Sequence, residues 1–381
     1  MKIGLVCPYD IAKGGGVQEI VFAMQTELMQ RGHEAYVIAP RPRGYDEETA
    51  KNKHIILVGA ATDFNSPLHT TVQVSAGMNE DIEAMLEEHK FDVLHFHEPW
   101  VPVLSRQILT RSNAVNVATF HAKLPETMMS RTLVKVVTPY TKPLLKYIHE
   151  FTAVSESAAE YVCSLTDKPV ALIPVGVDLD LYKAPARRSD NRKKKSIFYV
   201  GRLENRKGVK HMLYAFRMLQ DKYPDITLNI AGNGPDREKL EMLARDLDLK
   251  HVNFLGFVTE KDKIKHLRNA DLFCAPALYG ESFGLVLLEA MATGLVTVAG
   301  NNPGYAGVMQ GLGAISLVNP KDDAEFARRL DLLLHEPDLR KLWRAWAEEQ
   351  LPQYAYSTIV SQYEEVYRQA IEQYDAEAAN E

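Results

Sequence analysis

Two stretches of the chain repeat the same order of hydrophobic and polar positions. The first begins with an apolar run at residues 3–7, passes through Gly14-Gly15-Gly16, continues with helically spaced apolar residues as far as Gly32, and ends with a second apolar run at 36–39. The helically spaced positions are Val17, Ile20, Val21, Met24 and Leu28. This order predicts a strand, a glycine loop, a helix and a second strand.

The second half of the chain repeats this order. An apolar run at 197–200 is followed by a loop from Gly201 to Gly208, a helical pattern and a further apolar run at 226–230. The helical pattern consists of Met212, Leu213, Phe216 and Leu219. Strand–helix–strand units build parallel sheets, so we expect an α/β protein with two doubly wound, Rossmann-like domains. A polar, proline-containing connection at 174–196 marks the expected boundary between them.

Composition and charge narrow the class of protein. A chain of 381 residues with 46% hydrophobic residues, 25% charged residues and a net charge of −6 is typical of a globular protein with two domains. The charge argues against nucleic acid as a partner. The first apolar run is too short for a signal peptide, which predicts a cytoplasmic protein. The widely spaced Cys7, Cys163 and Cys274 predict neither disulfides nor a zinc site.

The segment 280–294 carries two carboxylates on an otherwise apolar pattern. If the whole segment is helical, Glu281 and Glu289 lie about 12 Å apart along the axis and about 80° apart in rotation. Glu281 is then expected at a helix N-terminus, where the backbone N–H groups of Ser282, Phe283 and Gly284 are able to meet an anion. A nucleotide sugar fits both carboxylates, and the alternative is a buried helix in which Glu289 is simply paired.

Polar residues also follow two strands of the first half. His95 lies in an apolar run at 92–96 that ends in His97-Glu98-Pro99, and His121 follows the run at 117–120. Carboxyl ends of parallel strands bind ligands, so these side chains are expected at a crevice. The histidines also suggest a metal site, but no cysteine or acidic third ligand has a fixed spacing to them, and we predict none.

Basic and glycine residues indicate an anion site. Gly14-Gly15-Gly16 before a helix permits close approach of a phosphate, although a plain flexible turn explains it equally well. Arg202 and Lys207 after a strand suit a diphosphate, with a solvated loop pair as the alternative. The D-x-D sequences at 178–180 and 246–248 are interpreted as non-metal segments.

These residues resemble the retaining glycosyltransferases of family 4 with the GT-B fold, and especially the bacterial phosphatidylinositol mannosyltransferases. The matching segments run almost end to end and include 6–9, 15–18, 91–95, 97–99, 118–121, 176–178, 201–202, 206–208, 274–276 and 281–284. The resemblance implies two domains facing across a catalytic cleft, at 1–173 and 174–357. It also implies that a terminal helix at 358–381 crosses back to complete the first domain.

The resemblance also implies roles for individual residues. Gly15, Gly16, Arg202 and Lys207 are expected to hold the donor diphosphate, Glu281 the hexose, and Glu289 the ribose. Val258 and Lys263 are expected to flank the base, with Ser282, Phe283 and Gly284 completing the donor site. His121 is expected beside the reacting sugar. The catalytic set is then His121, Arg202, Lys207 and Glu281.

The acceptor side departs from the inositol enzymes. Its candidate residues are Tyr9, Gln18, Trp100, Lys123 and Arg206. Trp100 and Ala122 stand where those enzymes carry an asparagine and a hydroxyl residue, which argues against an inositol lipid. The expected helix at 79–88 is acidic where theirs is basic, and acidic residues are repelled by anionic lipid. An amphipathic segment at 128–148 is interpreted either as a peripheral contact with the inner membrane face or as a lid or core helix.

We therefore predict a metal-independent hexosyltransferase without a cofactor. The donor is a nucleotide sugar, with GDP-mannose favoured and a UDP-sugar as the alternative, and the acceptor is a hydroxyl of a lipid or glycan. No carboxylate is placed by spacing as a nucleophile, so front-face displacement with retention is expected. The competing classes are a UDP-glucose-type enzyme with a soluble acceptor, a non-catalytic nucleotide-sugar-binding protein, and an epimerase or phosphorylase.

Overall fold

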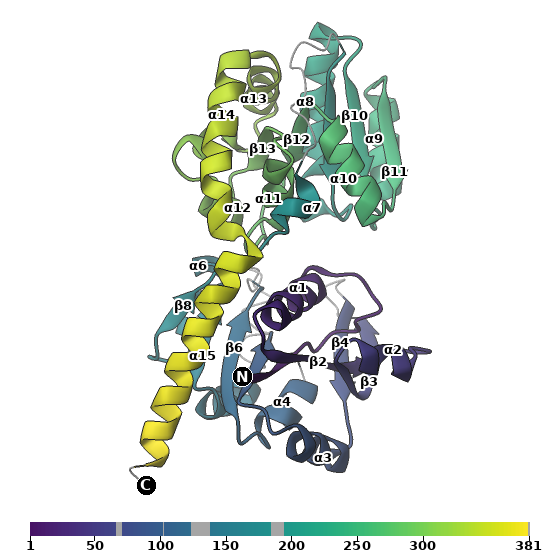
Figure 1. The fold of residues 1–381 in the computed structure, drawn as a ribbon. Helices are drawn as coiled ribbons and strands as arrows, with labels where there is room; N and C mark the ends of the chain where they lie inside the picture. The colour runs from purple at the N-terminus through teal and green to yellow at the C-terminus, as the bar shows by residue number, and fades with distance from the viewer. Residues whose placement is uncertain (66–70, 102, 123–137, 184–193, 380–381) are drawn as a thin grey trace. The chain divides into compact units, whose positions relative to one another are not determined.

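The computed structural model describes residues 1–65, 71–101, 103–122, 138–183 and 194–379 (Figure 1). The chain divides into two compact units. Unit 1 contains Met1–Val175 and Tyr356–Glu381, and unit 2 contains Gly176–Ala355. Each unit is built around a parallel sheet, as the repeated strand–helix–strand pattern predicts. The divisions lie close to the predicted boundaries at 173/174 and 357/358.

Unit 1 contains an eight-stranded sheet in the order β4-β3-β2-β1-β5-β6-β7-β8. All neighbours are parallel except β3 and β4, which pair antiparallel. The strands are β1 (Lys2–Val6), β2 (Glu34–Arg41), β3 (Ile55–Asn65), β4 (Thr71–Ala76), β5 (Val93–His97), β6 (Val115–Phe120), β7 (Glu150–Ala153) and β8 (Val170–Leu172). Because β1 is flanked by β2 on one side and β5 on the other, the strand order reverses beside β1.

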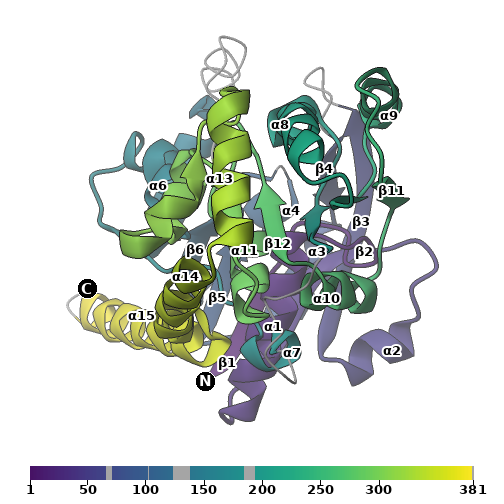
Figure 2. The same ribbon diagram turned by 90° about the horizontal axis from the view of Figure 1, so that it is seen from above.

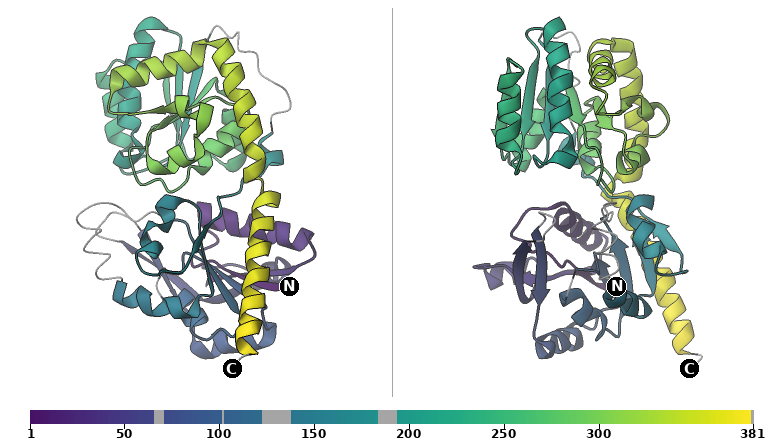
Figure 3. Two further views of the ribbon diagram at one scale, coloured as in Figure 1. Left: turned by 90° about the vertical axis from the view of Figure 1, so that its left-hand side faces the viewer. Right: turned by 180° about the vertical axis from the view of Figure 1, so that it is seen from behind.

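Helices cover both faces of the unit 1 sheet. They are α1 (Gly16–Gln30), α2 (Glu47–Asn52), α3 (Asn79–His89), α4 (Leu104–Leu109), α6 (Glu156–Cys163), the 3₁₀ helix η1 (Lys142–Tyr147) and α15 (Tyr356–Ala378). Figure 1 shows α1 on the opposite side of the sheet from α3 and α4. The predicted terminal helix is α15, which contacts α1 and β6 and runs along unit 1 (Figure 3).

Polar contacts fix α15 to unit 1 in addition to its buried apolar side chains. Glu364 accepts hydrogen bonds from the Arg31 guanidinium and lies 2.7 Å from Nε2 of His33. Nearer the C-terminal end, the Tyr374 hydroxyl donates to the Asn113 carbonyl oxygen at 3.4 Å. Unit 1 therefore completes its core with a segment from the far end of the chain.

Unit 2 contains a six-stranded parallel sheet in the order β11-β10-β9-β12-β13-β14. The strands are β9 (Ser196–Val200), β10 (Thr227–Ala231), β11 (Val252–Gly256), β12 (Leu272–Ala275), β13 (Thr297–Gly300) and β14 (Leu317–Val318). Apolar side chains of these strands are buried from both faces, as parallel strands require. The order reverses between β9 and β12, and ligands of such sheets bind beyond the strand ends at this point.

The helices of unit 2 pack on the sheet and on one another. They are α7 (Leu179–Tyr182), α8 (Val209–Lys222), α9 (Arg237–Asp246), α10 (Glu260–Asn269), α11 (Leu285–Ala292), α12 (Pro303–Val308), α13 (Asp323–His335) and α14 (Pro337–Gln350). The 3₁₀ helices are η2 (Asn205–Lys207), η3 (Gly311–Ser316) and η4 (Leu351–Tyr354). Helix α8 contacts α9 and α13 (Figure 2), whereas α11 contacts α7 and α14.

No helix among the described residues is both long enough and apolar enough to cross a membrane. Within the segment proposed as amphipathic, Leu144 and Ile148 are buried in the core of unit 1. Lys142 and Lys146 in the same segment are exposed, and Met128 to Val137 lie outside the described residues.

Candidate active site

The candidate site in unit 2 is built on the loops that follow β9 and β12. These loops approach closely, because the Leu278 N–H donates to the Arg206 carbonyl oxygen at 2.8 Å. Gly208 makes the approach feasible. Its φ of +70° is left-handed, and a Cβ at this position would lie 2.0 Å from the Pro276 carbonyl oxygen. The loops thus bring residues 202–207 and 280–284 together at the point where the strand order reverses.

Glu281 is the centre of this cluster. Its Oε1 lies 2.8 Å from Arg206 Nη1 and 2.8 Å from Lys207 Nζ. The side chains of Glu281 and Lys207 are only 13% and 18% exposed. One carboxylate oxygen therefore holds two cations in a largely buried position, and the interpretation of Lys207 as a solvated loop residue is wrong.

The other cation of the predicted diphosphate site has a different environment. The Arg202 side chain is 50% exposed, and its Nε lies 3.6 Å from Glu204 Oε2. The second oxygen of Glu204 accepts from Arg206 Nε at 2.7 Å. Arg202 is thus loosely held and accessible, which leaves its guanidinium available to an anion.

The prediction that Glu281 and Glu289 share one helix is wrong. Helix α11 begins at Leu285, and Glu281, Ser282 and Phe283 lie in the loop before it. Gly284 precedes the helix with a φ of +122°, and a Cβ there would lie 2.8 Å from the Tyr305 ring. The axial spacing worked out from an ideal helix therefore does not apply to the two glutamates. Gly284, a left-handed residue, sets the path of the loop instead.

Glu289 lies on α11 with a side chain that is 5% exposed. Its Oε1 accepts from Lys263 Nζ at 3.0 Å, while Oε2 has no hydrogen-bond partner among the described residues. Burial raises the pKa of Glu289 to about 7, although the Lys263 ammonium and the nearby Tyr182 hydroxyl oppose the shift. A buried carboxylate oxygen without a hydrogen-bond donor is costly. The interpretation that Glu289 is merely paired therefore explains Oε1, which contacts Lys263, but not Oε2.

Tyr182 and Glu260 complete the surroundings of Lys263. Glu260 Oε2 lies 2.8 Å from Lys263 Nζ, and Glu260 Oε1 accepts from the Tyr182 hydroxyl. No sequence motif identified Tyr182, which lies on the short helix α7. Val258 precedes α10 and packs partly against the core of unit 2, beside the 80% exposed Phe257.

The candidate residues of unit 1 follow β1, β5 and β6. Gly16 is the first residue of α1 and Gly15 is its N-cap. The Gln18 side chain turns back onto its own loop, since Nε2 donates to the carbonyl oxygens of Asp10 at 3.3 Å and Lys13 at 3.2 Å. Gln18 therefore stabilises the glycine loop. The sequence had predicted for it only a contact with the acceptor substrate.

The three histidines of unit 1 form hydrogen bonds to protein groups. His95 Nδ1 lies 2.7 Å from the Tyr367 hydroxyl, and His95 Nε2 lies 2.6 Å from Thr119 Oγ1. His97 Nδ1 lies 2.9 Å from His121 Nε2. Burial lowers the pKa of His121 to about 4 and that of His95 to about 3, so both rings are neutral near pH 7. Among the described residues, no three metal-ligating side chains are grouped.

Two buried ring nitrogens remain without partners. These atoms are His97 Nε2 and His121 Nδ1, and no described residue bonds to either. His121 thus has one nitrogen fixed by His97 and one open, which suits contact with a ligand hydroxyl.

Glu98 is a residue that the sequence placed at the expected crevice without assigning it a role. Its Oε1 accepts the backbone N–H groups of His121 and Ala122 at 2.5 Å each. The signal available was its position directly after the strand that carries His95 and His97. Tyr9 lies near enough for the Glu98 charge to contribute to the raised pKa of its hydroxyl, after burial as the main cause.

Trp100 is half-buried, with its ring 5.1 Å from that of Phe120 and 6.1 Å from that of Tyr161. Its Nε1 has no hydrogen-bond partner in the described part of the chain. Lys123, the remaining acceptor candidate, lies outside the described residues.

One aspartate of each D-x-D sequence, Asp178 or Asp248, has a partner close to it in the chain. The Asp178 side chain accepts the Leu181 N–H at 2.9 Å and caps α7. Asp248 pairs with Lys250.

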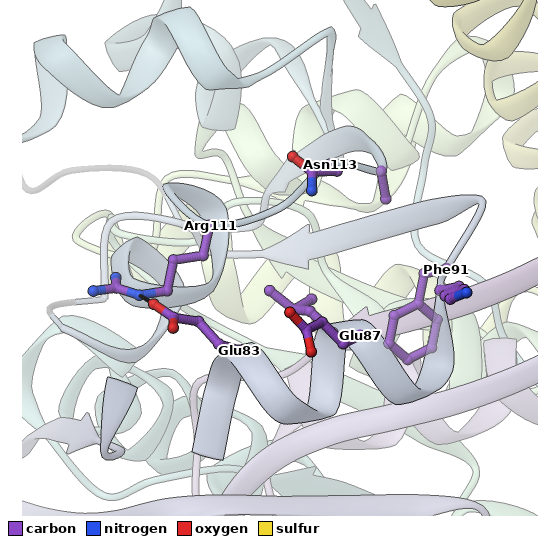
Figure 4. A pocket seen from close by; sticks show the side chains of 8 residues that line it. Glu83, Glu87, Phe91, Arg111 and Asn113 are labelled. Atoms are coloured by element: carbon purple, nitrogen blue, oxygen red, sulfur yellow. Dashed lines mark hydrogen bonds and ion pairs between the residues drawn. The ribbon is translucent and has the colours of Figure 1, made fainter. Parts of the chain in front are cut away.

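A separate pocket of about 360 Å³ lies in unit 1 between α3 and the segments that precede β5 and β6. Figure 4 shows Glu83 and Glu87 on α3 facing Arg111 and Asn113, with the Phe91 ring beside them. Glu83 and Arg111 form an ion pair at 3.0 Å. None of the predicted site residues lines this pocket, which lies at the amino ends of the strands. Helix α3 is acidic, as predicted.

Two family descriptions match successive parts of the chain. Residues 14–181 match Glycosyltransferase Family 4, and residues 183–350 match Glycosyl transferases group 1. The phosphatidyl-myo-inositol mannosyltransferase of Mycolicibacterium smegmatis is 33% identical over 372 residues, which cover 96% of this chain and 93% of that protein. The protein of the same name from Mycobacterium leprae is 32% identical over 371 residues, 96% of each chain.

Solved structures are similar over almost the whole chain. Sucrose-phosphate synthase from Thermosynechococcus elongatus has a TM-score of 0.76 at 19% identity and covers 97% of this chain and 98% of that one. Anabaena HepE in complex with UDP-glucose has a TM-score of 0.74 at 19% identity, with 97% and 100% covered. At this level of identity the likeness concerns the fold.

Proposed function

The chain belongs to the family 4 glycosyltransferases and has the GT-B fold, and from this we propose that it transfers mannose from GDP-mannose to a hydroxyl of a lipid-linked or glycan acceptor. The observation that carries the proposal is the pair of charged clusters in unit 2. Glu281 with Lys207 and Glu289 with Lys263 lie in the loop after β12 and on the helix that follows it. The mannosyltransferase relatives favour mannose over glucose as the sugar.

In this proposal the donor diphosphate binds Arg202 and Lys207 beyond the end of β9. Arg202 is exposed and only weakly paired, so it contacts the phosphates with little rearrangement. Lys207 is bound to Glu281 in the structure. When the donor binds, Lys207 leaves the Glu281 carboxylate and contacts a phosphate. Glu281 then accepts hydrogen bonds from hydroxyl groups of the sugar in place of Lys207.

Glu289 is proposed to bind the ribose. Its unpartnered Oε2 is able to accept a hydrogen bond from a hydroxyl group, and Lys263 keeps its Oε1 in place. A ribose hydroxyl would remove the cost of the unpaired oxygen, which is why this carboxylate favours a polyhydroxyl ligand.

The reaction follows from these contacts. As the bond from the anomeric carbon to the phosphate oxygen breaks, negative charge grows on the diphosphate and is stabilised by Arg202 and Lys207. The acceptor oxygen forms its bond on the same face, and its proton passes to the departing phosphate. Configuration at the anomeric carbon is retained. His121, whose neutral ring offers one open nitrogen, is proposed to contact the sugar.

The cations that act on the leaving group are side chains, so we propose that no divalent metal takes part. Arg202 and Lys207 supply two positive charges at the phosphates, which is the role of a metal in other transferases.

The acceptor is proposed to bind near Tyr9 and Trp100 in unit 1. The relatives are named for phosphatidyl-myo-inositol, yet Trp100 and Ala122 depart from their pattern and α3 is acidic. We therefore propose a lipid-linked or glycan hydroxyl other than inositol, reached at the cytoplasmic membrane face without α3 as the anionic-lipid contact.

Calorimetric titration with GDP, UDP and ADP, followed by hydrolysis of GDP-mannose and UDP-glucose, tests the donor. We expect GDP to bind most tightly and GDP-mannose to be hydrolysed. The configuration of the released sugar, followed by NMR before mutarotation, tests retention. Binding of UDP alone would replace the donor assignment, and binding of both nucleotides without turnover would favour a non-catalytic protein.

A further inference from the structure

Glu98 has a backbone conformation that side-chain-bearing residues rarely adopt. Its φ is +52°, in the left-handed region. The conformation is held on both sides, because the Glu98 N–H donates to the Thr119 carbonyl oxygen at 2.9 Å and the Glu98 carbonyl oxygen accepts from the Val101 N–H at 3.1 Å. Strain of this kind persists where the surroundings fix it, and it is found disproportionately at functional sites.

The Glu98 side chain uses this conformation to reach the neighbouring strand. The residue is 7% exposed, and its Oε1 accepts two successive N–H groups, those of His121 and Ala122. Successive N–H groups that converge on one point form an anion-binding site, and here the Glu98 side chain occupies it. The contact fixes the direction in which the main chain leaves β6.

The ring of His121 is fixed from the same strand. His97, the residue before Glu98, places its Nδ1 2.9 Å from His121 Nε2. The main chain of His121 is therefore held by Glu98 and its ring by His97, while His121 Nδ1 remains open.

We propose that Glu98 is a positioning residue for sugar transfer, whose carboxylate holds His121 in the orientation that meets the reacting sugar. This inference rests on the proposed function insofar as His121 contacts the sugar. It adds a residue outside the donor and acceptor sets, and it makes the orientation of His121 depend on the charge of Glu98.

The charge of Glu98 changes in the physiological range. Burial raises its pKa to about 7, and the two N–H groups oppose the shift. The titratable groups that face it are Tyr9 after β1, His97 on its own segment and His121 after β6. Burial raises the pKa of Tyr9 and lowers the pKa of both histidines, so these three stay neutral between pH 6 and 8. The charge-assisted contact is therefore formed as the pH rises through about 7.

Glu98→Gln tests the proposal, because glutamine has the same length and remains uncharged at every pH. Glu150→Gln is the matched control. Glu150 is a partly buried carboxylate, and burial raises its pKa as well. It lies at the amino end of β7, whereas Glu98 follows the carboxyl end of β5. Thermal unfolding at pH 8 is expected to show both variants folded.

The first readout does not require activity. In protein labelled with ¹⁵N-histidine, the backbone amide signal of His121, assigned from its loss in His121→Asn, should titrate with a midpoint near pH 7. The titration should persist in Glu150→Gln and vanish in Glu98→Gln. A His121 amide signal that does not titrate would overturn the assignment.

The second readout is the release of GDP from GDP-mannose at saturating donor. The kcat of the wild type should rise through about pH 7, whereas Glu98→Gln should lose on the order of 10–100-fold in kcat and show no such rise. Glu289 also has a pKa of about 7, so the profile is repeated in Glu289→Gln, where the rise should persist. A Glu98→Gln variant with the kcat and pH profile of the wild type would overturn the inference.

The two readouts separate the inference from the proposed function. An amide titration in a protein that hydrolyses neither GDP-mannose nor UDP-glucose would refute the proposed function, and with it the role of Glu98 in sugar transfer. Hydrolysis without an amide titration would refute the inference and leave the proposed function standing.

Discussion

Replacement of Glu281 and Glu289 by glutamine should separate the two ends of the donor. The first carboxylate lies in the loop after β12 beside Lys207, and the second is buried on α11 beside Lys263. If Glu281 binds the hexose, Glu281→Gln should weaken the nucleotide sugar and spare the free nucleotide. If Glu289 binds the ribose, Glu289→Gln should weaken both ligands.

A hydrogen bond to a charged group contributes about 1.5–3 kcal/mol, or roughly a 10–150-fold change in Kd. We expect a loss of this size for GDP-mannose in both variants and for GDP in Glu289→Gln. Glu281→Gln should leave the Kd of GDP unchanged or lower it, because Lys207 Nζ then loses the anion that lies 2.8 Å away and is free to bind phosphate.

Isothermal titration calorimetry of each variant with GDP and GDP-mannose provides the measurement. Glu260→Gln is the matched control, because Glu260 also pairs with Lys263, at 2.8 Å, but its side chain is 47% exposed. The control should change the Kd of GDP little. Equal losses of GDP affinity in folded Glu281→Gln and Glu289→Gln would refute the assignment of Glu281 to the sugar.

Three further predictions concern the leaving group, the terminal helix and pH. Lys207→Ala should lower kcat/KM by a factor that corresponds to about 2–4 kcal/mol of lost transition-state stabilisation. The wild type should stay active in EDTA, and activity that requires added manganese or magnesium would contradict metal independence. Deletion of all residues after Ser357 removes most of α15 and should lower the thermal unfolding midpoint of unit 1, and a truncated protein that unfolds and turns over like the full chain would exclude this. Burial raises the folded-state pKa of Glu98 and of Glu289 from 4.5 to about 7, so the stabilisation that comes from their protonation is complete below about pH 4.5 and is lost as the pH rises to about 7. Tm should therefore fall between about pH 4.5 and 7, and less steeply in Glu289→Gln, whereas parallel curves would contradict the shift.

The periodic parts of the sequence predicted the architecture well. Apolar runs and helical spacing identified the strands and helices around both glycine loops, because burial against a parallel sheet imposes these patterns directly on the chain. The sequence also predicted that the cations Arg202 and Lys207 follow a strand, and both lie in the loop after β9, whereas their contact with a diphosphate stays a prediction.

The error at 280–294 has a local cause. Apolar spacing continues across Gly284, but this residue and Gly280 have φ values of +122° and +76°. Neither value is compatible with a right-handed helix. Glycine adopts helical and left-handed conformations alike, so the sequence does not show which one is used.

The contacts of Glu98 and of Tyr182 were not predicted, for a different reason. Their partners depend on which strands and helices become neighbours, as with Glu98, whose oxygen reaches the end of β6 only because His97 pairs with Thr119 in the register of β5 and β6. Such contacts join segments that are distant in sequence. No local pattern encodes them.

The position of α15 determines when unit 1 is able to finish folding during synthesis. Tyr367 supplies the hydroxyl beside His95 Nδ1, and Tyr363 lies 3.3 Å from Thr119 Oγ1. The ribosome makes these tyrosines after the whole of unit 2, although the strands that they complete are among the first to emerge. Until then His95 lacks one of its hydrogen-bond partners, and the face of the sheet under α15 is uncovered. Unit 2 is therefore the part that is able to fold first, and the N-terminal unit, which is translated earliest, reaches its native state last.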